Sequence, residues 1–267
     1  MNFIRLNRNT FYGWLWTSLI FTYLLIFIGG LVRVSGSGMG CPDWPTCFGK
    51  LIPPTNIDQI TWKPNINYKV GDMILKQDTL WVSDFNFRSN EIFIAENWHA
   101  YEKHDYAIFN SRHTWTEYLN RLFGVTTGLI ICITLVISFF KRKEFKSIYF
   151  ACFISFFLTG IEGFIGAMVV ESQLEPIIVS LHLFFALIIV NLQVYAITKL
   201  KLHMEPKLLE SSYLSNLPLI LKLLWVATII EILLGTHMRE GIEMLSKTFP
   251  NQNDIFLMNT LGIFKYI

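Results

Sequence analysis

The chain has 267 residues, of which 52% are hydrophobic and only 16% are charged. Soluble domains carry about 25% charged residues, so this composition excludes an ordinary soluble enzyme. The mean hydropathy of +0.42 indicates a membrane protein instead. A formal net charge of +2 is too small to indicate a nucleic-acid partner.

Five apolar segments have the length of about 20 residues that a helix needs to cross a bilayer. They predict an all-α membrane protein, and they lie at 12–32, 122–140, 148–170, 177–198 and 217–236. The first segment is too long for a signal peptide and lacks a small-residue cleavage site, so we expect a retained helix.

These segments divide the chain into four parts. They are an N-terminus with the first helix (1–34), a long cap loop (35–116), helices two to four (117–200) and a last part with the fifth helix (201–267). Lys and Arg cluster around Arg5 and Arg8 and in the connections 141–146 and 199–207, which share one side of the membrane. Cytoplasmic loops are rich in these residues. We therefore expect a cytoplasmic N-terminus, an external cap loop and a location in the inner (plasma) membrane.

The first apolar segment ends at Arg33 and is followed by a Gly/Ser hinge and two cysteines, Cys41 and Cys47. Disulfides persist outside the cytoplasm, and five intervening residues with two prolines would let the sulfurs approach, so we expect a disulfide. Two free thiols are the alternative. Two thiols are too few for a zinc site, and the absence of C-x-x-C-H excludes covalent c-type haem attachment. Cys132 and Cys152 lie in apolar helices as packing residues.

The long loop predicts a small cap packed over the outer membrane face. Its first part is rich in proline, and the weakly alternating runs 68–76 and 78–87 predict strands. The run 91–98 predicts either a third strand or the start of a helix. The tryptophans and tyrosines of the loop suit the membrane interface.

The segment that enters the second helix carries His113, Glu117, Asn120 and Arg121 at helical spacing, roughly on one face. Glu117 has three interpretations. It can pair with Arg121, it can be a charge at a helix N-terminus, or it can stabilise positive charge on a substrate that is being oxidised.

Ionisable side chains inside apolar helices are costly and usually mark a function. His182 stands alone in the apolar run 177–190, where its ring nitrogens need partners, so we favour an iron ligand over a packed structural histidine. Glu162 and Glu231 are more readily hydrogen-bond partners between helices than catalysts.

A bound haem would account for the glycines and arginines together. Glycines of the second and third helices would let these helices part around a flat macrocycle, and Arg33 and Arg121 would pair with its propionates. The alternative is that the glycines only permit close helix packing and the arginines only anchor helix ends. A faint repeat, Gly29–Arg33 and Gly235–Arg239, suggests a longer natural protein with a second copy of this arrangement.

At these positions the chain resembles the haem A synthase family. The motifs are GGLVRVSGSGMGCPDWPTCFGKLIPP, EYLNRLFGVTTGL, EGFIGAMVVESQLEP, SLHLFFAL and LLGTHMRE. The resemblance implies eight membrane helices in two similar four-helix bundles, each holding a haem between histidines. It also implies oxidation of a haem O methyl group to the formyl of haem A for terminal oxidases. Glu117 matches the family's carboxylate, His182 its helix-four histidine, and Cys41 and Cys47 its disulfide.

Two features depart from the family pattern. Asn120 stands where the pattern has histidine in Glu-x-x-His-Arg. The iron is then five-coordinate at His182, or His113 substitutes for the missing ligand. Residues 201–267 begin a second bundle but lack about three of its helices, so the second haem site cannot form from this chain alone.

The sequence supports two main hypotheses. The first is a haem A synthase, or its N-terminal portion, with haem b or haem O as cofactor and substrate. The second is a non-catalytic haem-binding membrane protein, either an electron carrier or a porphyrin-delivery factor for oxidase assembly. A scaffold or transporter fragment without cofactor is a third possibility. Expected partners are haem O, membrane lipid, a haem O synthase, oxidase assembly factors or a second copy of the chain.

Overall fold

The computed structural model describes residues 7–77, 79–101, 109–172, 174–206 and 217–248. Within these ranges, five helices are long and apolar enough to cross a membrane. They are α1 (Arg8–Val34), α2 (Ser111–Phe140), α3 (Lys146–Glu171), α4 (Pro176–Met204) and α5 (Leu217–Thr248). The prediction of an all-α, multi-pass membrane protein is confirmed.

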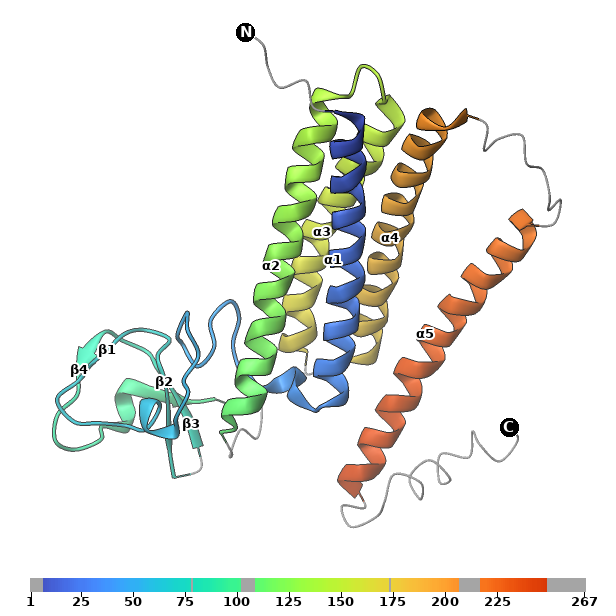
Figure 1. Ribbon diagram of the computed structural model, residues 1–267. Coiled ribbons are helices and arrows are strands. Elements are labelled where there is room, and N and C mark those ends of the chain that lie inside the picture. The colour runs from blue at the N-terminus through green and yellow to red at the C-terminus, as the bar shows by residue number, and fades with distance from the viewer. Residues whose placement is uncertain (1–6, 78, 102–108, 173, 207–216, 249–267) are drawn as a thin grey trace, which may run out of the picture.

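Helices α1 to α4 form an antiparallel four-helix bundle in which α1 also packs against α4 (Figure 1). Its apolar core lies in the half near the start of α1, where Phe11, Leu15, Ile148 and Leu200 are buried. A cavity of about 10 Å³ lies in this half, among Ser18, Thr134 and Gln193. Such a cavity holds about one water molecule, so this half of the bundle is closely packed.

Several buried polar side chains in the same half are paired across helices, while Ser155 Oγ and Gln193 Oε1 are buried without a hydrogen-bond partner among the described residues. Ser18 Oγ lies 2.7 Å from Thr134 Oγ1, and Gln193 Nε2 donates to Thr22 Oγ1 over 3.0 Å. These contacts join α1 to α2 and to α4. In lipid, helix association depends on such hydrogen bonds and on close packing, since the lipid is as apolar as the helices.

Helix α5 leans away from the bundle (Figure 1) and meets α4 through a few side chains. Ser180 Oγ lies 2.7 Å from Thr236 Oγ1, and the rings of Phe184 and Trp225 lie 6.2 Å apart. Most other apolar side chains of α5 are exposed. The side chain of Arg239 and the terminal run 262–267 of the sequence analysis lie outside the described residues.

The cap (residues 35–110) joins α1 to α2 and contains two small antiparallel sheets. One pairs β1 (Asn67–Tyr68) with β4 (Phe87–Arg88), and the other has the order β2 (Met73–Lys76), β3 (Thr79–Ser83), β5 (Trp98–Ala100). Two short 3-10 helices, Ser37–Met39 and Ile57–Gln59, precede the strands, and a third, Ala95–Asn97, lies between β4 and β5. The two predicted strand runs contain β2 and β3. The run 91–98 forms a short 3-10 helix that leads into β5.

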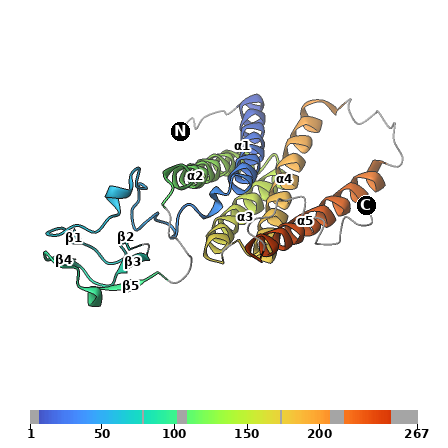
Figure 2. The same cartoon turned by 90° about the horizontal axis from the view of Figure 1, so that it is seen from below.

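The cap flanks α2 and does not cover the ends of all four helices, as the views in Figures 1 and 2 agree. Two buried clusters hold it together. One surrounds the cysteine pair with Phe48, Ile60 and Leu80, and the other is aromatic, with Tyr68 and Trp98. The cap is therefore a folded unit that lies beside the bundle.

Helix α2 begins at Ser111, earlier than hydropathy alone places it. The side chain of Asn110 accepts hydrogen bonds from the N–H groups of Arg112 (3.0 Å) and His113 (3.4 Å), as an N-cap does. Because α2 begins at Ser111, its first turns include the polar residues before the apolar run, and Glu117 lies in the second turn.

The chain before Cys41 passes very close to the first turn of α2. A Cβ atom on Gly40 would lie 2.4 Å from the carbonyl carbon and oxygen of His113. Thr114 Oγ1 donates to the carbonyl of Gly40 over 2.9 Å. Only glycine permits this approach, because the atoms opposite it belong to the backbone.

We expect Gly40→Ala to destabilise the protein by roughly 1–3 kcal/mol, the usual cost of overpacking. The added methyl group would push the cap away from α2 and break the bond between Thr114 and Gly40. Thermal unfolding in detergent measures this loss. Gly38→Ala is the control, since its Cβ would make an ordinary contact at 3.6 Å with Leu174. Equal effects of the two substitutions would contradict the close approach.

Candidate functional site

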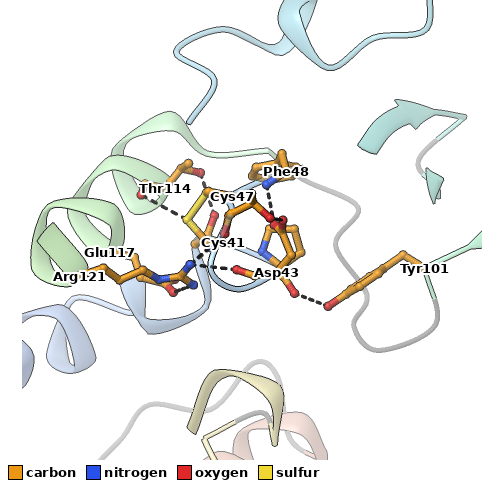
Figure 3. Close-up of polar contacts among 11 residues, drawn as sticks. Cys41, Asp43, Cys47, Phe48, Tyr101, Thr114, Glu117 and Arg121 are labelled. Atoms are coloured by element: carbon orange, nitrogen blue, oxygen red, sulfur yellow. Dashed lines mark hydrogen bonds and ion pairs between the residues drawn. A yellow bond between two sulfur atoms is a disulfide. The ribbon is translucent and has the colours of Figure 1, made fainter. Parts of the chain in front are cut away.

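A buried ion pair on α2 lies at the joint between the bundle and the cap (Figure 3). Glu117 is only 3% exposed. Its Oε1 lies 2.5 Å from Nη2 of Arg121, one helical turn further on. Its Oε2 accepts a hydrogen bond from the backbone N–H of Cys41 over 2.9 Å. The carboxylate therefore connects α2 to the start of the cysteine pair.

Cys41 and Cys47 form a disulfide, with Cα atoms 4.9 Å apart, and both are buried. The predicted disulfide is confirmed, and the alternative of two free thiols is excluded. Cys132 and Cys152 remain free on their helices, as expected.

Asp43 folds the loop that the disulfide closes. Its carboxylate accepts hydrogen bonds from the N–H groups of Phe48 (2.6 Å) and Gly49 (3.0 Å) and from the hydroxyl of Thr46. Arg121 Nη1 donates to the carbonyls of Asp43 and Thr46, both over 2.9 Å (Figure 3). Arg121 thus holds the disulfide loop (residues 41–49) against α2.

Tyr101, from the far side of the cap, also binds this loop. Its hydroxyl donates to the carbonyl of Pro42 (Figure 3). Burial of the phenol raises the pKa of Tyr101 to about 12, and the negative charges of Asp43 and Glu171 contribute to a smaller extent. The phenol is therefore a neutral donor at physiological pH. Sequence reasoning missed Tyr101 and Asp43, although Asp43 stands inside the Cys-Pro-Asp-Trp-Pro-Thr-Cys motif.

These contacts favour the structural interpretation of Glu117. Both of its oxygens have a donor, and the Nη1 and Nη2 atoms of Arg121 have acceptors in the protein. A role for Glu117 in catalysis, or for Arg121 at a propionate, requires that these contacts be exchanged. Both roles stay predictions.

His182 lies on the inner face of α4 at the cap end of the bundle. Ile189, Gln193 and Leu200 follow it at spacings of 7, 11 and 18 residues, which places all four on one side of the helix, and those three are buried. The His182 side chain is nevertheless 38% exposed. Part of this side chain is therefore not covered by the described residues.

The ring of His182 lies against α3. Its Nδ1 approaches Oε2 of Glu162 within 2.6 Å, as an ion-pair contact without the alignment of a hydrogen bond. A Cβ on Gly166 would lie 3.6 Å from its Cε1 atom. Metal-binding histidines commonly present one ring nitrogen to a carboxylate and the other to the metal. The arrangement fits an iron ligand whose Nε2 is available.

The other predicted ligand residues occupy different places. Asn120 precedes the buried Thr127 by seven residues on the inner face of α2, and its Oδ1 is buried without a hydrogen-bond partner among the described residues. Arg33 is partly buried in the last turn of α1. His113 Nδ1 lies 3.2 Å from the carbonyl of Gly36, just after α1.

The described residues contain no group of three or more His, Cys, Asp or Glu side chains that could bind a bare metal ion. A haem iron needs only axial protein ligands, because the macrocycle supplies the others. The partly exposed His182 on the inner face of α4 and the unpartnered oxygen of Asn120 fit such a group. Glu231 is exposed on α5, away from this set.

We expect Arg121→Met to cost about 3–5 kcal/mol of stability, because it leaves the buried Glu117 without its cation. It would also release the two loop carbonyls, so that Cys41 and Cys47 become easier to reduce and alkylate. Thermal unfolding and alkylation after mild reduction measure these effects.

Lys201→Met is the matched control, since Lys201 and Glu205 form an exposed pair with the same spacing, 2.7 Å apart. It should leave the unfolding temperature unchanged. Similar losses in Arg121→Met and the control would show that the buried pair does not hold the loop.

The chain matches the family model described as cytochrome oxidase assembly protein, COX15-CtaA, over residues 12–77 and 91–265. The similar proteins are named haem A synthase. That of Orientia tsutsugamushi (strain Ikeda) is 27% identical over 162 residues, which cover 61% of this chain and 38% of the relative. That of Rickettsia africae (strain ESF-5) is 25% identical over 265 residues, which cover 94% of this chain and 69% of the relative.

The haem A synthase of Rickettsia prowazekii (strain Madrid E) is 26% identical over 205 residues, 73% of this chain and 52% of the relative. In the first relatives the matched part covers about two-fifths of the protein. No solved structure matches the chain. Since the family model spans most of the sequence, including all four bundle helices and the disulfide loop, the chain belongs to the COX15-CtaA family of cytochrome oxidase assembly proteins.

Proposed function

We propose that the chain binds haem at the cap end of the four-helix bundle and acts in the synthesis of haem A. The observation that carries the proposal is the partly exposed His182 on the inner face of α4, whose Nδ1 lies 2.6 Å from a carboxylate oxygen of Glu162. The names of the relatives support haem A synthesis as the reaction. When bound, the haem would supply a redox-active iron and, as haem O, the methyl group that is oxidised to formyl.

The chain's own residues would hold and orient this group. His182 Nε2 would ligate the iron, and Glu162 would fix the ring and strengthen it as a donor. Asn120, on the facing side of the bundle, has an unpartnered oxygen that can accept a hydrogen bond from a bound group or water. Arg33, at the rim, would attract a propionate.

In this proposal Glu117 acts as a positioning residue. It holds Cys41 and Arg121, and through them the disulfide loop, next to the end of the bundle where the haem would lie. A direct electrostatic role at the reacting methyl group would require Glu117 to release one of these donors.

The proposed location is the inner membrane with the cap outside. Lys and Arg side chains gather at the end of the bundle opposite the cap, at Arg8, the connection 141–146 and the end of α4. This bias is typical of the cytoplasmic side. A haem O synthase, oxidase assembly factors or a second copy of the chain would be its partners there.

The second candidate function is non-catalytic haem binding, for electron transfer or porphyrin delivery. Two observations favour it: Glu117 is fully engaged, and Asn120 replaces the expected second histidine. Expression with haem O available, followed by pigment extraction and mass analysis, separates the two functions. A hydroxylated or formyl product supports synthesis, and bound but unmodified haem supports the second function. A colourless, folded preparation contradicts both.

We expect His182→Ala to abolish the haem absorbance of the purified protein, because the proposed iron ligand is lost. Glu162→Gln should retain haem with an affinity about 10–100-fold lower, the usual cost of losing the partner of a metal-bound histidine. Haem titration followed by absorbance measures both.

His203→Ala is the control, because His203 is exposed at the other end of α4 and its Nδ1 lies 2.9 Å from the Lys199 carbonyl. Its haem binding should match that of the unaltered protein. An unchanged spectrum in His182→Ala would exclude His182 as the ligand.

A further inference from the structure

The first part of the cap exposes large apolar side chains. Leu51 is 78% exposed and Ile52 68% exposed, and Trp44 and Ile57 nearby are exposed as well. Lys50 is the only charged residue between positions 44 and 57. Its Nζ donates to the carbonyl of Gln59 over 2.8 Å. Exposed apolar side chains gathered in so short a stretch indicate an interaction surface.

Two contacts with α2 fix the height of this stretch along the bundle. Arg121 donates to the carbonyl of Thr46, and Trp115 Nε1 donates to the carbonyl of Pro54 over 3.2 Å. Trp115 and Arg121 lie six residues apart, or about 9 Å along the helix axis. The stretch that carries Leu51 and Ile52 is thus tied at both ends to the part of α2 just before its apolar run begins at Leu122.

The stretch also lies on the lipid-facing side of α2. Trp115, Leu122, Leu129 and Val136 follow one another at seven-residue spacing and share a face, and the last three are exposed. In a membrane protein this face is covered by lipid. Figures 1 and 2 show the cap beside α2 on the side away from α4, which agrees with this placement.

We propose that residues 44–57 form a membrane-binding loop, with Leu51 and Ile52 inserted among the phospholipid chains at the bilayer interface. The loop continues the apolar surface of α2 outward and carries tryptophan, which favours the interface. Asp43, the acidic residue just before it, is turned inward to bind Phe48 and Gly49. The loop holds the cap down on the membrane beside the bundle.

The test uses a polarity-sensitive fluorophore on Leu51→Cys, with Cys132 and Cys152 replaced by alanine and the disulfide kept oxidised. The control is Ile92→Cys, which has the same 78% exposure in the sheet-bearing part of the cap. In phosphatidylcholine vesicles, the label at Leu51 should emit at shorter wavelength. It should be quenched several-fold more by nitroxide on the lipid chains than by iodide in water. The label at Ile92 should show the opposite preference.

Ile52→Cys carries the same label in a second variant, so that one poorly folded variant does not decide the result. Equal iodide quenching at Leu51, Ile52 and Ile92 would overturn the proposal. Protection from both iodide and lipid nitroxide would also overturn it, because a protein surface would then cover the loop. Neither outcome depends on haem, so this test is independent of the proposed function.

Discussion

The buried pair of Glu117 and Arg121 is the constraint on which the arrangement of this protein depends. Two opposite charges next to an apolar helix are costly unless they are paired and hydrogen-bonded. Here the carboxylate accepts hydrogen bonds from the N–H of Cys41 and from the guanidinium. The guanidinium also donates to two carbonyls of the disulfide loop. The same contacts that neutralise the pair therefore hold the cap beside α2. The position of the membrane-binding loop follows from this joint.

The bundle is divided along its length into two unlike halves. Near the start of α1 the core is mostly apolar. Some of its polar groups are bonded across helices, and Ser155 Oγ and Gln193 Oε1 are buried without a hydrogen-bond partner among the described residues. At the cap end, Glu162 and His182 meet on inner faces, and Asn120 keeps an unpaired oxygen. A membrane protein tolerates such unpaired groups where they serve a ligand or a water-filled space. The contact of Glu162 with His182 at the cap end therefore supports the proposed haem site there.

The sequence predicted the five helices well, because hydropathy is a local property that each segment carries by itself. It also predicted the disulfide, since spacing and compartment limit what Cys41 and Cys47 can do. The start of α2 was only partly predicted. The helical spacing from His113 to Arg121 indicated a polar helical segment, but hydropathy counts only the apolar run from Leu122 and not the turns after the N-cap Asn110. The partners of Glu117 and His182 were only partly foreseen. Cys41 lies 76 residues from Glu117, and such contacts depend on how the helices assemble.

The closely packed half of the bundle has an electrical consequence. Its described side chains leave a cavity for about one water molecule beside Ser18 and Gln193, so in a membrane this half would carry a large share of the transmembrane voltage. His182, in the half nearer the cap, then sits close to the electrical potential of that side. Electrons or protons exchanged at His182 from the cap side would cross only a small part of the transmembrane voltage. Such chemistry would therefore depend little on the size of that voltage.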